Sequence, residues 1–105
     1  MTQDNTLGEY QKIIDTWILD HGGYWSPLSM LSAIVEEVGE LAKEVNRLEG
    51  YKPKKPDEPK IDIGEELADV VFSVICVANY YKINMNRELS LVIEKFTKRD
   101  SNRFT

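Results

Sequence analysis

The sequence predicts an all-α fold of four main helices in a single domain spanning residues 1–105. Apolar residues recur three and four positions apart through most of the chain, which is the spacing of one face of an α-helix. Turn-forming stretches separate the periodic segments at residues 21–25, 51–60 and 82–86. A length of 105 residues suits one domain rather than two.

The first predicted helix runs from about Thr6 to Asp20. His21-Gly22-Gly23 ends it, because paired glycines favour a helix C-cap and a turn. His21 is the only histidine, and we interpret it as a helix-terminal or turn residue rather than as a metal ligand. The apolar face consists of Leu7, Tyr10, Ile13, Ile14, Trp17 and Ile18.

The second predicted helix starts after Ser26, a suitable N-cap, with Pro27 at its first position, and ends near Glu49-Gly50. Its apolar stripe comprises Met30, Leu31, Ile34, Val35, Val38, Leu41, Ala42, Val45 and Leu48. Three carboxylates, from Glu37, Glu40 and Glu44, line one side of this stripe. Like charges at this spacing repel by about 0.2–0.5 kcal/mol per pair, so a positive group is expected beside them.

Residues 51–60 contain three prolines and four lysines, which predicts a loop. This loop is either a solvated connector or a flap that supplies a lysine to a phosphate. The third predicted helix follows, from Asp62 or Gly64 to Lys82, with its own apolar stripe.

Glu66 and Asp69 lie in the same position relative to this third stripe as Glu37 and Glu40 do on the second helix. If the two helices pack antiparallel, the four carboxylates converge. Such oxygen ligands suit Mg²⁺ or Mn²⁺, and Mg²⁺ commonly also binds substrate phosphates. A structural interpretation also exists, because acidic residues near a helix start interact favourably with the helix dipole.

The fourth predicted helix runs from about residue 86 or 87 to 100, with Leu89, Val92, Ile93 and Phe96 facing inward. It ends in a basic run, Lys95, Lys98, Arg99 and Arg103. These cations either complement the helix dipole in solvent or form a patch that binds phosphates.

The composition is that of a globular protein, with 42% hydrophobic and 30% charged residues. The net charge of −5 argues against binding nucleic acid polymers but does not exclude a nucleotide substrate. A single cysteine, Cys76, excludes an intramolecular disulfide and is predicted to be a buried thiol. No stretch has membrane-spanning length, so we expect a cytoplasmic protein without a membrane partner.

Trp25, in the connector before the second helix, has two interpretations. It either packs as a hinge aromatic at the helix start or offers a flat surface on which a base stacks beside the carboxylates.

The acidic residues also carry a family resemblance. Glu36-Glu37-x-x-Glu40, followed by Glu66-x-x-Asp69, resembles the EExxE…ExxD signature of MazG-like nucleotide pyrophosphatases, members of the all-α NTP pyrophosphatase superfamily. The resemblance extends to Tyr24-Trp25-Ser26-Pro27, Glu40-Leu41-Ala42 and Leu67-Ala68-Asp69-Val70.

This resemblance implies a role for each matching residue. Glu37, Glu40, Glu66 and Asp69 would bind Mg²⁺, and Glu36 would be a supporting carboxylate that orients water or a second metal. Lys95 and Arg99 would contact phosphates, and Trp25 would contact the base. The family also implies a homodimer or homotetramer.

The expected function is Mg²⁺-dependent hydrolysis of nucleoside or deoxynucleoside triphosphates to the monophosphate and pyrophosphate, in nucleotide-pool housecleaning. The alternative is a non-catalytic helical module for dimerisation or partner binding. A di-metal redox bundle is disfavoured, because its Glu-x-x-His motifs are absent. Base and sugar preference, a tri- or diphosphate substrate, the number of metals and the physiological role stay open.

Overall fold

The computed structural model describes residues 4–50, 55–57, 60 and 62–103. It contains four helices and, within these ranges, no strand. The helices are α1 (Leu7–Asp20), α2 (Pro27–Leu48), α3 (Ile63–Tyr80) and α4 (Met85–Arg103). The predicted all-α class with four helices is therefore confirmed. None of the described helices combines the length and the apolar content needed to cross a membrane.

The helix starts follow the capping residues of the sequence. Ser26 caps α2 by accepting from the Ser29 backbone N–H, and Pro27 is the first helical residue, as predicted. Asp62 caps α3 by accepting from the Glu65 N–H at 3.0 Å. A side-chain acceptor at this position satisfies one of the backbone donors that a helix start leaves unpaired.

Helices α1 and α3 both end in left-handed turns. After α1, Gly22 has φ of +108°, and the Gly23 N–H donates to the Ile18 carbonyl at 2.9 Å. After α3, Lys82 takes the same role with φ of +59°, and the Ile83 N–H donates to the Ala78 carbonyl at 2.8 Å. Both are Schellman-type ends, which usually carry glycine at the left-handed position.

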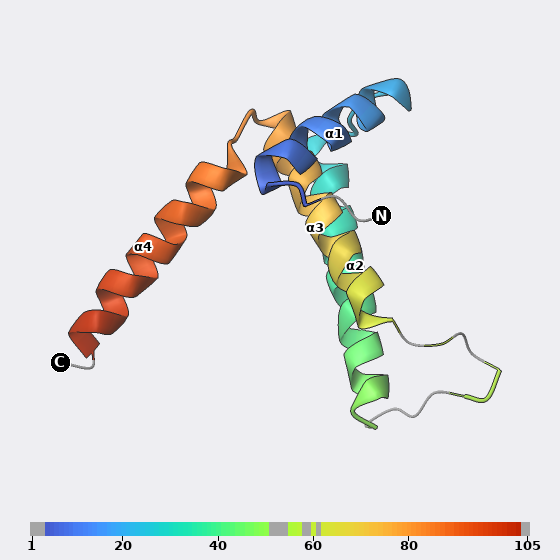
Figure 1. The fold of residues 1–105 in the computed structure, drawn as a ribbon. Coiled ribbons are helices and arrows are strands. Elements are labelled where there is room, and N and C mark those ends of the chain that lie inside the picture. Colours follow the sequence, from blue (N-terminus) through green and yellow to red (C-terminus); the bar gives the residue numbers. More distant parts are fainter. Residues whose placement is uncertain (1–3, 51–54, 58–59, 61, 104–105) are drawn as a thin grey trace.

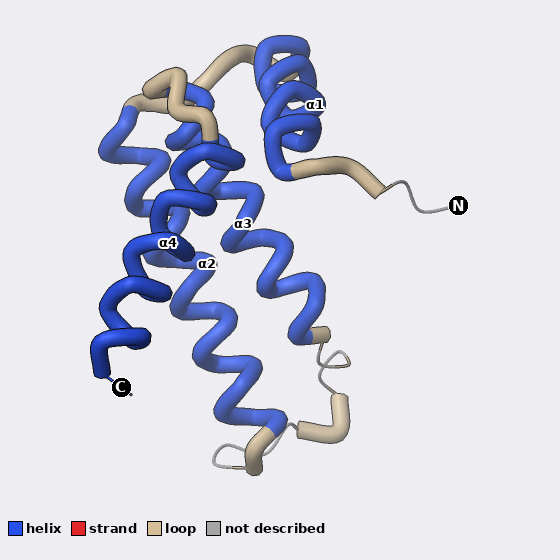
Figure 2. Tube along the Cα trace, turned by 60° about the vertical axis from the view of Figure 1, so that its left-hand side comes forward, coloured by secondary structure: helices blue, strands red, loops and turns tan. Residues whose placement is uncertain are grey.

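Helices α2 and α3 form the body of the molecule as an antiparallel pair (Figures 1 and 2). Helix α1 lies across the end of this pair where α3 finishes, and packs mainly on α3. Helix α4 starts near α1 and then runs away from the α2–α3 pair (Figure 1). The radius of gyration of 17.2 Å reflects this open shape, since a compact chain of this length has about 13 Å.

The core of the single chain is small. Its buried apolar residues, among those described, are Met30, Ile75, Cys76 and Ala78. Cys76 is therefore a buried thiol, as predicted, and its burial raises its pKa. The α4 side chains expected to face inward, Leu89, Val92, Ile93 and Phe96, are instead exposed. They are uncovered because α4 packs chiefly on α1 and leaves the α2–α3 pair.

The predicted proline-rich loop is described only in part. Residues 51–54 and 58–59 lie outside the described ranges, so the interpretation of this loop as a lysine-bearing flap stays a prediction.

Candidate metal centre and adjoining pocket

Three carboxylates from the two paired helices come together. Glu37 of α2 and Glu66 and Asp69 of α3 each offer an oxygen, and these oxygens all lie within 4.8 Å of one another. The antiparallel packing places the middle of α2 beside the start of α3. Oxygens around an octahedral Mg²⁺ are about 3–4 Å apart, so small side-chain rotations would suffice to ligate one ion.

Other carboxylates surround Glu66. The pKa of Glu66 is raised chiefly by its loss of solvation. Repulsion from Asp69, Glu37, Glu40 and Glu44 raises it further. A carboxylate surrounded by like charges is harder to ionise, and a nearby cation would reverse that effect. The donor set therefore fits a hard divalent cation.

The other predicted carboxylates lie farther out. Glu40 is not among the three that share the 4.8 Å limit, although its charge contributes to the raised pKa of Glu66. Glu36 is exposed and also outside the set. Glu44 accepts from Arg47 Nη1 at 3.1 Å, which offsets part of its charge.

A cavity of about 390 Å³ opens beside the carboxylates. Glu37, Asp69 and Trp25 all line it, so the structure brings two of the four predicted metal ligands together with the predicted stacking residue. The remaining lining residues are Trp17, Ile18, His21, Gly23, Tyr24, Met30, Ala33, Phe72, Ser73 and Cys76. Such a lining, mostly apolar with a few polar groups, is typical of small-molecule sites.

The sequence pattern did not predict that aromatic side chains form one wall of this cavity. The rings of Trp17 and His21 stack with centroids 4.1 Å apart and planes 20° apart. Phe72 of α3 meets Trp17 edge-on, with centroids 5.8 Å apart. His21 Nδ1 lies 2.6 Å from the Trp17 carbonyl, which can only accept, so Nδ1 carries the proton. The i,i+4 spacing of Trp17 and His21 was the available signal, but Trp17 also fits a core position.

Tyr24 forms a polar edge of the cavity. Its hydroxyl donates to Asp15 Oδ1. Burial, and then this hydrogen bond, raise the pKa of Tyr24 to about 12. The phenol is therefore neutral at physiological pH and anchors the connector to α1.

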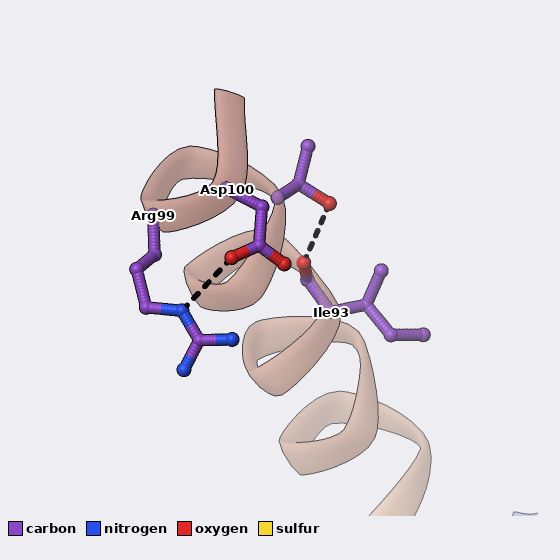
Figure 3. Close-up of polar contacts among 4 residues, drawn as sticks. Ile93, Arg99 and Asp100 are labelled. Carbon is purple, nitrogen blue, oxygen red and sulfur yellow. Dashed lines mark hydrogen bonds and ion pairs between the residues drawn. The ribbon is translucent and has the colours of Figure 1, made fainter. Parts of the chain in front are cut away.

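Lys95 and Arg99 lie on α4, apart from the carboxylates of their own chain (Figure 1). Both are exposed, and both lie over the Phe96 ring, with Lys95 Nζ at 5.1 Å and Arg99 Cζ at 4.8 Å from its centroid. Figure 3 shows that Arg99 also pairs with Asp100 along the helix. Neither cation lines the cavity.

The fold and the acidic centre thus have the features of an all-α nucleotide pyrophosphohydrolase. The family model of the MazG nucleotide pyrophosphohydrolase domain matches residues 25–104. The chain therefore belongs to this family of hydrolases, which act on phosphoanhydride bonds.

Individual relatives agree with this assignment. The chain is 41% identical over 103 residues to the YpjD protein of Bacillus subtilis strain 168, covering 97% of this chain and 93% of that protein. The crystal structure of B. subtilis YpjD superposes with a TM-score of 0.80 at 40% identity, covering 90% of this chain and 98% of the other. The Bacillus-conserved MazG protein, a nucleotide pyrophosphohydrolase, gives a TM-score of 0.76 at 38% identity, covering 90% and 92%.

Proposed function

We propose that this protein hydrolyses nucleoside or deoxynucleoside triphosphates to the monophosphate and pyrophosphate in the presence of Mg²⁺, with Mn²⁺ as a possible substitute. One observation carries the proposal: Glu37 and Asp69 line the same cavity as Trp25. Metal ligands and a stacking surface in one cavity suit a substrate that joins a polyphosphate to a flat base. The physiological role we propose is nucleotide-pool housecleaning in the cytoplasm.

The carboxylates have distinct roles in this proposal. Glu37, Glu66 and Asp69 hold the cation, and Glu40, which already contributes to the field at Glu66, joins them. Glu36 is a supporting group that orients water or a second ion. The bound cation supplies Lewis-acid chemistry, offsetting phosphate charge and lowering the pKa of water.

The base binds against the aromatic side chains of the cavity. Trp25 is 67% exposed, so its ring is free to stack on a ligand. The Trp17–His21 stack forms a second flat surface in the same cavity. Base–aromatic stacking is worth about 1–3 kcal/mol per base.

Phosphate binding is proposed to require a homodimer or homotetramer. Large apolar side chains are exposed on the outer face of α2 and along α4, among them Val35, Leu48, Leu89 and Ile93. Many exposed large apolar side chains on two helices favour an interaction site there. Because α4 runs away from its own acidic centre, we propose that Lys95 and Arg99 reach the phosphates bound in another subunit.

Pyrophosphate release from a panel of nucleotides with Mg²⁺ tests the proposed reaction, with Glu37→Gln as the control. We expect release by the wild-type protein and none by the variant.

A second experiment tests whether one site is built from two subunits. Equal amounts of Glu37→Gln chains and of Lys95→Ala/Arg99→Ala chains are refolded together, and turnover is measured. Recovery of turnover supports cations supplied by a second subunit, and no recovery would place them in the same chain.

The exposed apolar faces also favour the second candidate function, a non-catalytic module for dimerisation or partner binding. That function predicts no nucleotide turnover and no change in melting temperature with Mg²⁺. It also predicts that Glu37→Gln is neutral or slightly stabilising, because only repulsion is removed.

A further inference from the structure

The Gln11 side chain makes three hydrogen bonds at the junction between α1 and α4. Gln11 Nε2 donates to Asn79 Oδ1 at 3.0 Å and to the Ile83 carbonyl at 2.8 Å. Gln11 Oε1 accepts from the Met85 N–H at 2.9 Å. A single residue of α1 therefore contacts the last turn of α3, the connector and the first residue of α4.

The starts of α1 and α4 cap each other. The Met85 N–H is one of the donors that the start of α4 leaves unpaired, and Gln11 satisfies it. In return, Asn86 Oδ1 of α4 accepts from the Gly8 N–H of α1 at 3.2 Å. A Cβ at position 8 would lie 2.6 Å from Asn86 Nδ2, so the two helices approach closely there.

Gln11 is itself fixed by a buried partner. Asn79 is the buried polar residue among those described, with 9% of its surface exposed. Its Nδ2 donates to the Gln11 carbonyl at 2.9 Å while its Oδ1 accepts from the Gln11 side chain. Two amides paired in this way have a restricted geometry, because each buried donor or acceptor left unpaired costs about 1–3 kcal/mol.

A largely polar hollow borders the same junction. It is open, has a volume of about 420 Å³ and is lined by residues that include Lys12, Asn84 and Asn86. Helix α4 makes its main contact with α1. Within one chain, the direction of α4 therefore depends largely on the hydrogen bonds of Gln11 and Asn86.

A small change in the direction of α4 displaces the residues at its far end by several ångströms. With a rise of 1.5 Å per residue, Lys95 lies about 15 Å and Arg99 about 21 Å from the start of the helix. A rotation of about 10° at the junction would displace these residues by about 3–4 Å. A displacement of this size would take the two cations out of hydrogen-bond range of the phosphates and would weaken substrate binding.

We propose that Gln11 is a positioning residue: it fixes the direction of α4 and thereby the place at which Lys95 and Arg99 meet the substrate phosphates. This inference rests on the proposed function, in which α4 supplies the phosphate-binding cations. Gln11 does not line the cavity proposed to bind the base. It is also not one of the carboxylate residues proposed to bind the metal.

Gln11→Met is the principal test, because methionine has a similar length and loses all three side-chain hydrogen bonds. In the full-length protein we expect the KM for a nucleoside triphosphate to rise about tenfold while kcat changes less than about threefold. The affinity for the unphosphorylated nucleoside and the rise in melting temperature with Mg²⁺ are expected to be unchanged. Gln11→Glu keeps the acceptor for the Met85 N–H but places a carboxylate oxygen against the Asn79 Oδ1 and Ile83 carbonyl acceptors, so the rise in KM is expected to be at least as large as in Gln11→Met. Thr16→Met, exposed on the same helix, is the matched control and is expected to leave every quantity unchanged.

A distance measurement separates this inference from the proposed function. Spin labels at Thr16→Cys and Glu94→Cys, in a Cys76→Ala background and diluted with unlabelled protein, report the α1–α4 distance within one chain. We expect a narrow distribution that broadens or shifts in Gln11→Met. An unchanged distribution, or a fall in melting temperature with unchanged KM, would overturn the inference and leave Gln11 a structural role. Absence of nucleotide turnover in the wild-type protein would contradict the proposed function, while the distances would still decide whether Gln11 directs α4.

Discussion

Glu37 of α2 and Glu66 of α3 present carboxylate oxygens within 4.8 Å of each other, across the interface of the two antiparallel helices. Repulsion within this cluster contributes to the raised pKa of Glu66. The folded protein therefore holds close together negative charges that would separate on unfolding. This arrangement is expected of a cation site, and without the cation it lowers the stability of the folded state.

The first prediction concerns Glu66. Glu66→Gln is expected to raise the melting temperature of the metal-free protein and to abolish both the further rise with Mg²⁺ and the turnover. Glu65→Gln is the matched control: Glu65 lies in the same first turn of α3 but outside the cluster, so it is expected to keep the Mg²⁺ response. Differential scanning fluorimetry with and without Mg²⁺ measures both. An undiminished Mg²⁺ response in Glu66→Gln would remove Glu66 from the site.

The second prediction concerns the stacking surface. Trp25→Ala is expected to change stability little, because the side chain is already 67% exposed. The affinity for nucleosides is expected to fall about tenfold, since base–aromatic stacking contributes about 1–3 kcal/mol. Isothermal titration calorimetry gives the affinity, and Leu28→Ala, an exposed neighbour outside the cavity lining, is the control. Equal affinities of the two variants would assign Trp25 to the connector alone.

The third prediction concerns pH. The pKa of Tyr24 is about 12 in the folded protein, chiefly because of burial, and about 10 in an unfolded chain. The neutral phenol thus contributes stability that is fully present below the unfolded-state pKa and is lost as the pH rises through the folded-state pKa.

Urea denaturation at about pH 8 and about pH 11 tests this linkage. The urea midpoint of the wild-type protein is expected to fall more between these two pH values than that of Tyr24→Phe, which has no group to ionise at this position. Parallel falls in the two proteins would show that other groups control the alkaline loss of stability.

The fourth prediction concerns the end of α3. Lys82 has φ of +59°, a left-handed conformation that is unfavourable for a side chain with a Cβ. Lys82→Gly is expected to raise the free energy of unfolding by about 1 kcal/mol. Gly22→Ala is the reverse test, because Gly22 has φ of +108° and open space around it, and it is expected to lower the stability. Chemical denaturation measures both, and a destabilised Lys82→Gly would show that the Lys82 side chain contributes more than its backbone costs.

Much of the local structure was predictable because it depends on neighbours in the sequence. Ser26 caps α2 as expected, α3 begins after Asp62, which caps it, and Gly22 ends α1 in a left-handed turn. The convergence of Glu37 with Glu66 and Asp69 was also predictable, since all three border apolar stripes that must face each other. Glu40 borders the same stripe but lies outside the cluster, because periodicity gives the face of a side chain and not its distance across an interface.

The sequence by itself determined the helical class, the ends of the helices and the acidic faces of α2 and α3. These features depend on capping residues and on the helical period, which act within a few residues. The tertiary structure alone decided that Trp17 and His21 form a wall of the cavity and that α4 turns away with its apolar face exposed. The Trp17–His21 stack is local, but its place in the cavity depends on packing against Phe72 of α3. The direction of α4 depends on hydrogen bonds between residues distant in the sequence, such as Gln11 with Asn79 and Met85, and no local pattern encodes it.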